Sequence, residues 1–187
     1  MSRIIVDSIR NSSASSDGIT LSSDGKVTFP NTSTGKILQV LQVVKTDTFS
    51  INSTTYTDIT GMSQAITYTA GNKILITFDG GAGYGASDQF VNIRLCNSSG
   101  VISGAVGATD GSRTLATTAI RGHSNSNIQA VNFTYLDTPS GTSETYKLQM
   151  RSANAGNTSY LNRSGADDNA GYRSRVISTL TLMEIAA

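Results

Sequence analysis

The chain has 187 residues, of which 37% are hydrophobic and 14% are charged, and its formal net charge is +1. The charged share is well below the usual share of about 25%, and small polar residues take the place of the missing charged residues. Such residues suit turns and solvent-facing strand positions and disfavour long helices. The near-neutral charge, without a basic run, argues against nucleic-acid binding, because such proteins gather Lys and Arg on one face.

The sequence also limits redox chemistry and targeting. Its only cysteine, Cys96, cannot form an intramolecular disulfide. The opening from Met1 to Asp7 is too short and too soon charged for a signal peptide, and no apolar run approaches the roughly 18 residues of a membrane span. We therefore expect synthesis in the cytoplasm, no export through a standard secretion signal and no membrane insertion.

Residues 1–36 carry apolar residues in small clumps. Farther along this segment, Ile19 to Leu21 and Val27 to Phe29 alternate apolar and polar residues around Ser22 to Gly25, which predicts a hairpin. An isolated hairpin is marginal in water, so we expect another part of the protein, sister copies or another protein to hold it. The first apolar clump consists of Ile4, Ile5, Val6 and Ile9.

A series of short strands follows Gly35. The β-branched apolar run Ile37 to Val44 favours a strand, and Arg175 to Ile185 is apolar on both faces, which predicts a strand inside a sheet. Turn clusters rich in Gly, Asn and Ser separate further strands, and residues 103–126 are interpreted as elaborated loops. This spacing predicts an all-β fold, a jelly-roll-like antiparallel β-sandwich. The other predicted strands are 56–59, 64–69, 73–78, 91–95, 131–135 and 146–150.

The sequence offers no enzyme constellation. His123 is the only histidine, and a polar loop residue is a better interpretation than a general base. Cys96 has no nearby activating base, which favours a small strand residue over a nucleophile. Gly80 to Gly85 lacks the ending of a phosphate loop and is interpreted as a strand connector. Asp167 to Asn169 lacks calcium-loop spacing and is interpreted as a solvated turn. We expect no catalytic residue, cofactor or metal.

Four residues in or beside predicted loops are candidates for surface recognition. Aromatic rings in loops can stack on sugars or fill a pocket of a partner, and packing over the sandwich edges is the alternative. The candidates are Tyr84, His123, Tyr160 and Tyr172.

The hydrophobic share of 37%, which predicts a thin core, the hairpin that cannot stand alone and the long apolar strand together predict a homotrimer. Strands 37–44 and 175–185 are the candidates to lie near a threefold axis. The interface candidates are Leu38, Val40, Leu180 and Leu182.

Several stretches resemble the small tail-fibre and virion structural proteins of marine and freshwater phages, cyanophages among them. The opening, residues 2–9 followed by Gly18 to Leu21, resembles their N-termini, and Thr34 to Val40 with Thr46 to Ser50 resembles the start of their C-terminal β domain. The resemblance covers most of the chain and is weakest over residues 80–126. Further matching stretches are 55–62, 72–76, 132–137, 145–149 and 182–187.

The resemblance implies a phage particle component with a TNF/C1q-like trimeric knob. Residues 1–36 would form a virion attachment segment, docking through Ile4, Ile5, Val6 and Ile9, and residues 37–187 would form the knob. The partners would be other virion proteins of the tail, neck or capsid, with a host-surface glycan as a candidate ligand for host adhesion. A capsid decoration protein that stabilises the shell is the alternative. A cellular carbohydrate-binding module and an enzyme are less favoured.

Overall fold

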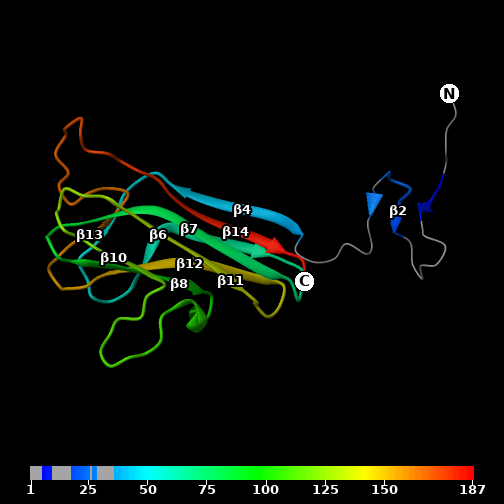
Figure 1. Cartoon of the computed structure of the whole chain (residues 1–187), viewed down its shortest axis with the longest axis horizontal. Coiled ribbons are helices and arrows are strands. Elements are labelled where there is room, and N and C mark those ends of the chain that lie inside the picture. The colour runs from blue at the N-terminus through cyan, green and yellow to red at the C-terminus, as the bar shows by residue number, and fades with distance from the viewer. Residues whose placement is uncertain (1–5, 10–17, 26, 29–35) are drawn as a thin grey trace.

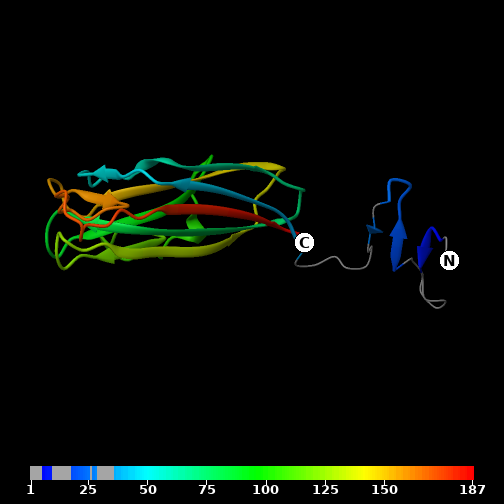
Figure 2. The same cartoon turned by 90° about the horizontal axis from the view of Figure 1, so that it is seen from above.

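A computed structural model describes residues 6–9, 18–25, 27–28 and 36–187. Within these ranges the protein is all-β, with antiparallel sheets and no α-helix. Two of the sheets face each other as the layers of a sandwich, which Figures 1 and 2 show from two directions. The predicted jelly-roll-like β-sandwich is therefore confirmed.

The predicted N-terminal hairpin is present in a small sheet. It comprises β1 (Ser8–Ile9), β2 (Ile19–Leu21) and β3 (Val27–Thr28), with β2 in the middle. Gly25 closes the turn with φ at +79°, a value that glycine reaches without steric cost. Of the predicted docking residues, Ile4 and Ile5 lie outside the described ranges. The other two, Val6 and Ile9, are 41% and 56% exposed.

The first layer of the sandwich is a six-stranded sheet built around β7. Strand β11 flanks β7 on one side, and β14 and β13 follow one another along the other side, with β4 and β5 beyond them. As predicted, the C-terminal strand lies inside the sheet, and β4 forms an outer edge. The strands are β4 (Ile37–Lys45), β5 (Phe49–Ile51), β7 (Lys73–Tyr84), β11 (Gln129–Asp137), β13 (Ser159–Leu161) and β14 (Ser178–Ile185).

The second layer is a five-stranded sheet in the order β10, β8, β12, β6, with β9 paired to β8. The two strands predicted around Gly61 are one continuous strand, β6. Gly61 adopts φ of +81° and the pairing register with β12 shifts opposite it, so the strand passes through an irregularity at this glycine and does not end there. The segment 103–126, interpreted as loops, contains β10 and a short 3-10 helix, η1. The elements are β6 (Thr57–Thr67), β8 (Phe90–Asn97), β9 (Gly100–Val101), η1 (Ser103–Ala105), β10 (Thr118–Arg121) and β12 (Ser143–Ser152).

The core forms where every second residue of the two sheets points between them. In β7 these residues are Ile74, Ile76 and Phe78, all without solvent exposure. Leu180 and Leu182 face the same core and are also fully buried, so their prediction as trimer-interface residues was wrong. Because side chains alternate along a strand, the residues of β14 that face outward are the others: Thr179, Thr181, Met183 and Ile185.

Strand β7 extends through the glycine-rich stretch that was interpreted as a connector. The prediction of Tyr84 as a surface recognition residue was therefore wrong, because Tyr84 ends this strand with 0% exposure. A Cβ atom at Gly122 would overlap the Tyr84 ring, so glycine at that position lets the neighbouring loop cover the ring.

Candidate functional site

Residues 163–177, here called the insertion loop, interrupt one strand line of the six-stranded sheet. Strand β11 occupies one side of β7 along most of its length, so β13 and β14 both pair with its other side. Leu161 lies opposite Ala82, and Thr179 lies opposite Asp79. The chain thus leaves the sheet and returns to almost the same register. Compact surface loops whose ends lie close together often carry function.

Asn162 clamps the two ends of the insertion loop. Its side-chain nitrogen Nδ2 donates to the carbonyl oxygens of Lys45 and Asp47, both at 2.9 Å. Its Oδ1 accepts from the Ser178 hydroxyl at 2.7 Å, and its backbone N–H donates to Gly81 at 2.7 Å. Asn162 is fully buried with φ of +66°, a conformation that asparagine tolerates better than most residues. The clamp therefore satisfies every polar atom of this buried side chain.

Asp167 holds the two arms of the insertion loop together. It accepts from Arg163 Nη1 and from Arg175 Nη2, each at 2.6 Å. The hydrogen bond from Arg175 lowers the pKa of Asp167 below its ordinary value, despite some opposing desolvation. The Arg163 guanidinium also lies over the Tyr160 ring, with Cζ 3.9 Å from the ring centroid. The recognition candidate Tyr160 is thereby half covered by its own chain.

Asp168 braces the tip of the insertion loop. It accepts from Arg173 Nε at 2.6 Å and from the Tyr172 hydroxyl at 3.1 Å. The hydrogen bond from Arg173 is the main reason that the pKa of Asp168 lies below its ordinary value. The Arg173 Cζ atom lies 4.9 Å from the centroid of the Tyr172 ring. The turn interpreted as solvated is therefore held by arginine and tyrosine side chains.

The glycines of β7 explain how the insertion loop can lie on the sheet. A Cβ atom at Gly83 would overlap the carbonyl oxygen of Arg163, and one at Gly81 would lie 2.6 Å from Cγ2 of Val176. Such glycines mark places where another backbone approaches a strand closely. The glycine-rich stretch is thus the seat of the insertion loop.

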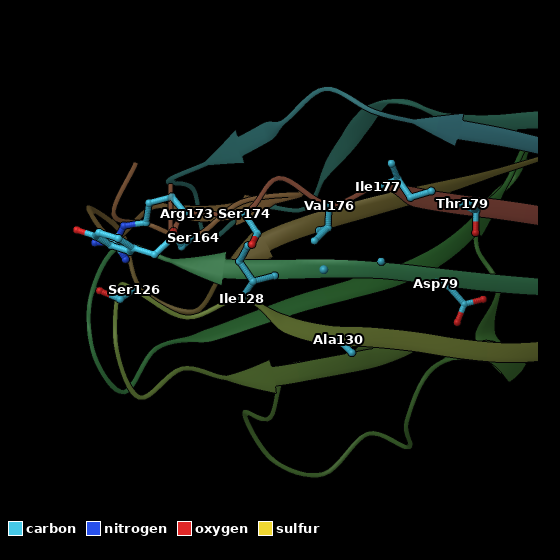
Figure 3. Close-up of a pocket in the computed structure, with 13 residues that line it drawn as sticks. Asp79, Ser126, Ile128, Ala130, Ser164, Arg173, Ser174, Val176, Ile177 and Thr179 are labelled. Carbon is cyan, nitrogen blue, oxygen red and sulfur yellow. The ribbon is translucent and has the colours of Figure 1, made fainter. Parts of the chain in front are cut away.

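Between the insertion loop and the sheet lies a cavity of about 640 Å³ (Figure 3). Its apolar lining includes Gly80 and Gly81 of β7 and the side chains of Ile128, Val176 and Ile177. Figure 3 shows Asp79 and Thr179 at one end of the cavity and Arg173 and Ser126 at the other. The cavity therefore combines an apolar middle with polar ends.

Asp79 is the exposed carboxylate of this cavity. It lies in the middle of the sheet, with Asn132 and Thr179 opposite it on the neighbouring strands. No hydrogen bond or ion pair engages its side chain within the part of the chain that the structure describes. A carboxylate in this state is available to accept hydrogen bonds from a ligand.

The recognition candidates are not brought together. Tyr172 lines the cavity and is 74% exposed, whereas Tyr160 does not line it. His123 lies on another loop, 70% exposed, with Nδ1 4.0 Å from Oδ1 of Asp88. Sequence reasoning missed Asp79 as a cavity residue, and its only signal was a charge directly before a run of glycines.

A second surface feature lies on the outer face of the six-stranded sheet. Four apolar residues stand opposite one another across four strands, and we call them the apolar row: Val40, Met183, Leu75 and Leu136. Val40 is 53% exposed and Leu136 is 48% exposed. Of the trimer-interface candidates, Val40 belongs to this row, and Leu38 beside it is 47% exposed.

The rest of this face carries little charge. The next row is polar but uncharged and consists of Thr134, Thr77, Thr181 and Gln42. The outward charged residues on β4, β7, β11 and β14 are Lys73, at the start of β7, and Asp79, in its middle. The charged neighbour of the apolar row on these four strands is therefore Lys73, which lies on the same face as Leu75 and is exposed at the start of β7.

In the ranges that the structure describes, no cluster of three or more His, Cys, Asp or Glu side chains could hold a metal ion. The same ranges contain no helix with the length and apolarity needed to cross a membrane. No protein-family model matches the chain, and no curated protein matches it.

Proposed function

We propose that this protein is a non-enzymatic structural component of a phage particle. In this proposal it is a homotrimeric fibre that docks on the particle through residues 1–36 and presents residues 37–187 as a knob. The resemblance of the N-terminus and of most of the knob to small virion structural proteins motivates the assignment to a particle. The observation that carries the assembly is the apolar row.

The apolar row is unusual for a solvated sheet face. The outer face of an antiparallel sandwich normally alternates with the core and is polar. Here Val40 and Leu136 expose about half of their surface, and Leu75 and Met183 lie between them. Burying such a side chain contributes about 1.5–3 kcal/mol. Because the same face occurs on every copy, association of copies around an axis would cover it.

The small N-terminal sheet supports the docking part of the proposal. Besides Val6 and Ile9, two residues of its strands are partly exposed: Leu21 at 39% and Val27 at 49%. Apolar side chains on so small a sheet gain from insertion into a socket on another virion protein. A capsid decoration protein would dock through the same sheet. The position of the protein on the particle would distinguish this function from that of a fibre.

The assembly can be tested with Val40→Asp combined with Leu136→Asp. Sedimentation velocity of the full chain at micromolar concentration should give a trimer for the wild type and a monomer for the variant, since charges opposite an apolar partner surface are not solvated. Phe90→Asp on the five-stranded sheet is the matched control, because Phe90 is 45% exposed on the other layer. Circular dichroism should show that both variants are folded. A monomeric wild type would contradict the proposal, and so would a trimeric Val40→Asp, Leu136→Asp variant.

A further inference from the structure

The cavity under the insertion loop has the size of a ligand site. Its volume of about 640 Å³ lies within the usual range of about 300–1,000 Å³ for small-molecule sites. Its shape is fixed by the Asn162 clamp and by the ion pairs of Asp167 and Asp168. A cavity that is formed before the ligand arrives binds with less loss of conformational entropy.

The polar groups of the cavity suit a ligand with several hydroxyl groups. Asp79 offers carboxylate oxygens that have no partner within the described residues, and Thr179 stands opposite it on β14. Hydrogen bonds from a hydroxyl group to a carboxylate are short and strong. At the other end, Ser126 and Ser174 add hydroxyl groups that can donate or accept. The separation of these groups along the cavity suits more than one contact to the same ligand.

The aromatic side chain of the cavity is held in place. The Tyr172 hydroxyl donates to Asp168, and Arg173 lies against the ring. Tyr172 is nevertheless 74% exposed as a whole residue, so its ring can contact a ligand. A braced aromatic ring loses little rotational freedom when the apolar face of a sugar packs on it.

The charges of the cavity limit the kinds of ligand that can enter. The positive charge of Arg173 is balanced by Asp168, with which it forms a 2.6 Å ion pair. Asp79 has no such counter-charge among the described residues. Asp79 would therefore repel a carboxylate, sulfate or phosphate group on a ligand, whereas hydroxyl, amide and amino groups could donate hydrogen bonds to it.

We infer that the cavity binds an uncharged or amino sugar as part of an oligosaccharide. Asp79 accepts hydroxyl or amino hydrogens, Tyr172 contacts the apolar face of a sugar ring, and the hydroxyl groups of the loop complete the contacts. This inference rests on the proposed function, because it names the ligand class that the knob of a particle protein would recognise.

The test uses the full chain on immobilised oligosaccharides of defined composition. The panel contains neutral hexoses, deoxyhexoses, N-acetylhexosamines and free hexosamines, with sialylated and sulfated oligosaccharides and an oligolysine peptide as competitors. We expect binding to at least one neutral or amino sugar and none to the acidic sugars. Asp79→Asn and Tyr172→Ala should each weaken binding by about tenfold or more, because the first removes the negative charge and one acceptor oxygen and the second removes the aromatic ring.

Two matched variants control this test. Asp110→Asn changes an exposed carboxylate on a loop that does not line the cavity, and Phe90→Ala changes a partly exposed aromatic ring on the other sheet. Both should bind within about twofold of the wild type, since a change without a contact has little effect on affinity. Equal melting temperatures would exclude unfolding as the cause of lost binding.

Several outcomes would overturn the inference. These are no binding to any sugar, a preference for acidic sugars, unchanged binding by Asp79→Asn and Tyr172→Ala, or binding of oligolysine alone. Binding by the dissociated Val40→Asp, Leu136→Asp variant but not by the wild type would also overturn it, because the assembly would then cover the cavity. A trimer that binds no sugar would refute this site and leave the proposed function standing. Sugar binding by a protein that is absent from particles would refute the proposed function alone.

Discussion

Replacing Asn162 by alanine should destabilise the sandwich strongly. The substitution removes two donated hydrogen bonds and one accepted hydrogen bond, and it leaves the carbonyl groups of Lys45 and Asp47 and the Ser178 hydroxyl without this partner. Each buried polar group left unsatisfied costs about 1–3 kcal/mol. Alanine at φ of +66° adds about 1–2 kcal/mol. Because neighbouring groups relax and water can enter, we expect a loss of about 3–5 kcal/mol in the free energy of unfolding.

Asn162→Gly separates the two contributions. Glycine adopts the left-handed backbone conformation readily but makes none of the side-chain hydrogen bonds. The free energy of unfolding of Asn162→Gly should therefore exceed that of Asn162→Ala by about 1 kcal/mol and still lie well below that of the wild type. Asn154→Ala is the control, since the Asn154 side chain bonds, among the described residues, to Gln89 alone and on the surface. Urea unfolding at one fixed protein concentration measures all four proteins. A loss below about 1 kcal/mol for Asn162→Ala would refute the role of the clamp.

Three further predictions concern the insertion loop, a buried carboxylate and the domain boundary. Gly83→Ala should lower the free energy of unfolding by about 1–3 kcal/mol and speed trypsin cleavage of the insertion loop, because the new Cβ atom overlaps the backbone of that loop. Gly107→Ala is the control and should be neutral, since a Cβ atom there meets no neighbour. Equal cleavage of the two variants would contradict this prediction. The pKa of Glu184 lies below its ordinary value, chiefly because the Thr69 N–H donates to it. The ionised Glu184 carboxylate therefore stabilises the fold fully above about pH 4.3, and this contribution is lost as the pH falls through the folded-state pKa. Melting temperatures of the wild type should consequently drop more steeply in acid than those of Glu184→Gln. Parallel curves for the two proteins would count against this prediction. Residues 34–187 alone should give an all-β circular dichroism spectrum and a cooperative melt, and an insoluble product would mean that the two parts share one core.

The sequence predicted the strands well where one face of a strand is clearly apolar. The two-residue period of a strand puts Ile74, Ile76 and Phe78 on one face, and that face is the buried one, although Leu75 between them is also apolar. The C-terminal strand is apolar on both faces, and alternation alone could not show which face points inward. Pairing with β7 decides this, and it places Leu180 and Leu182 in the core.

The candidate site could not be predicted because it depends on non-local register. Glycine has a low preference for strands, so the stretch from Gly80 to Gly85 was interpreted as a connector. Its real role is visible only when the insertion loop lies on it, since the loop fills the space that Cβ atoms would need. Asp79 likewise becomes notable only when the chain returns at Ser178 and encloses a cavity above it. Tyr172 was the one cavity residue that an exposed aromatic ring in a loop could indicate.

The most direct test of the central claim is quantitative mass spectrometry of purified phage particles. Particles assembled with the wild-type chain should contain it in fixed copy number, in multiples of three. Particles assembled with the Ile4→Asp, Val6→Asp variant should lack it, although the soluble knob of that variant keeps its melting temperature, because charged side chains do not enter an apolar socket. Absence of the wild-type chain from the particles would contradict the account, and full occupancy by the variant would contradict docking through the N-terminus.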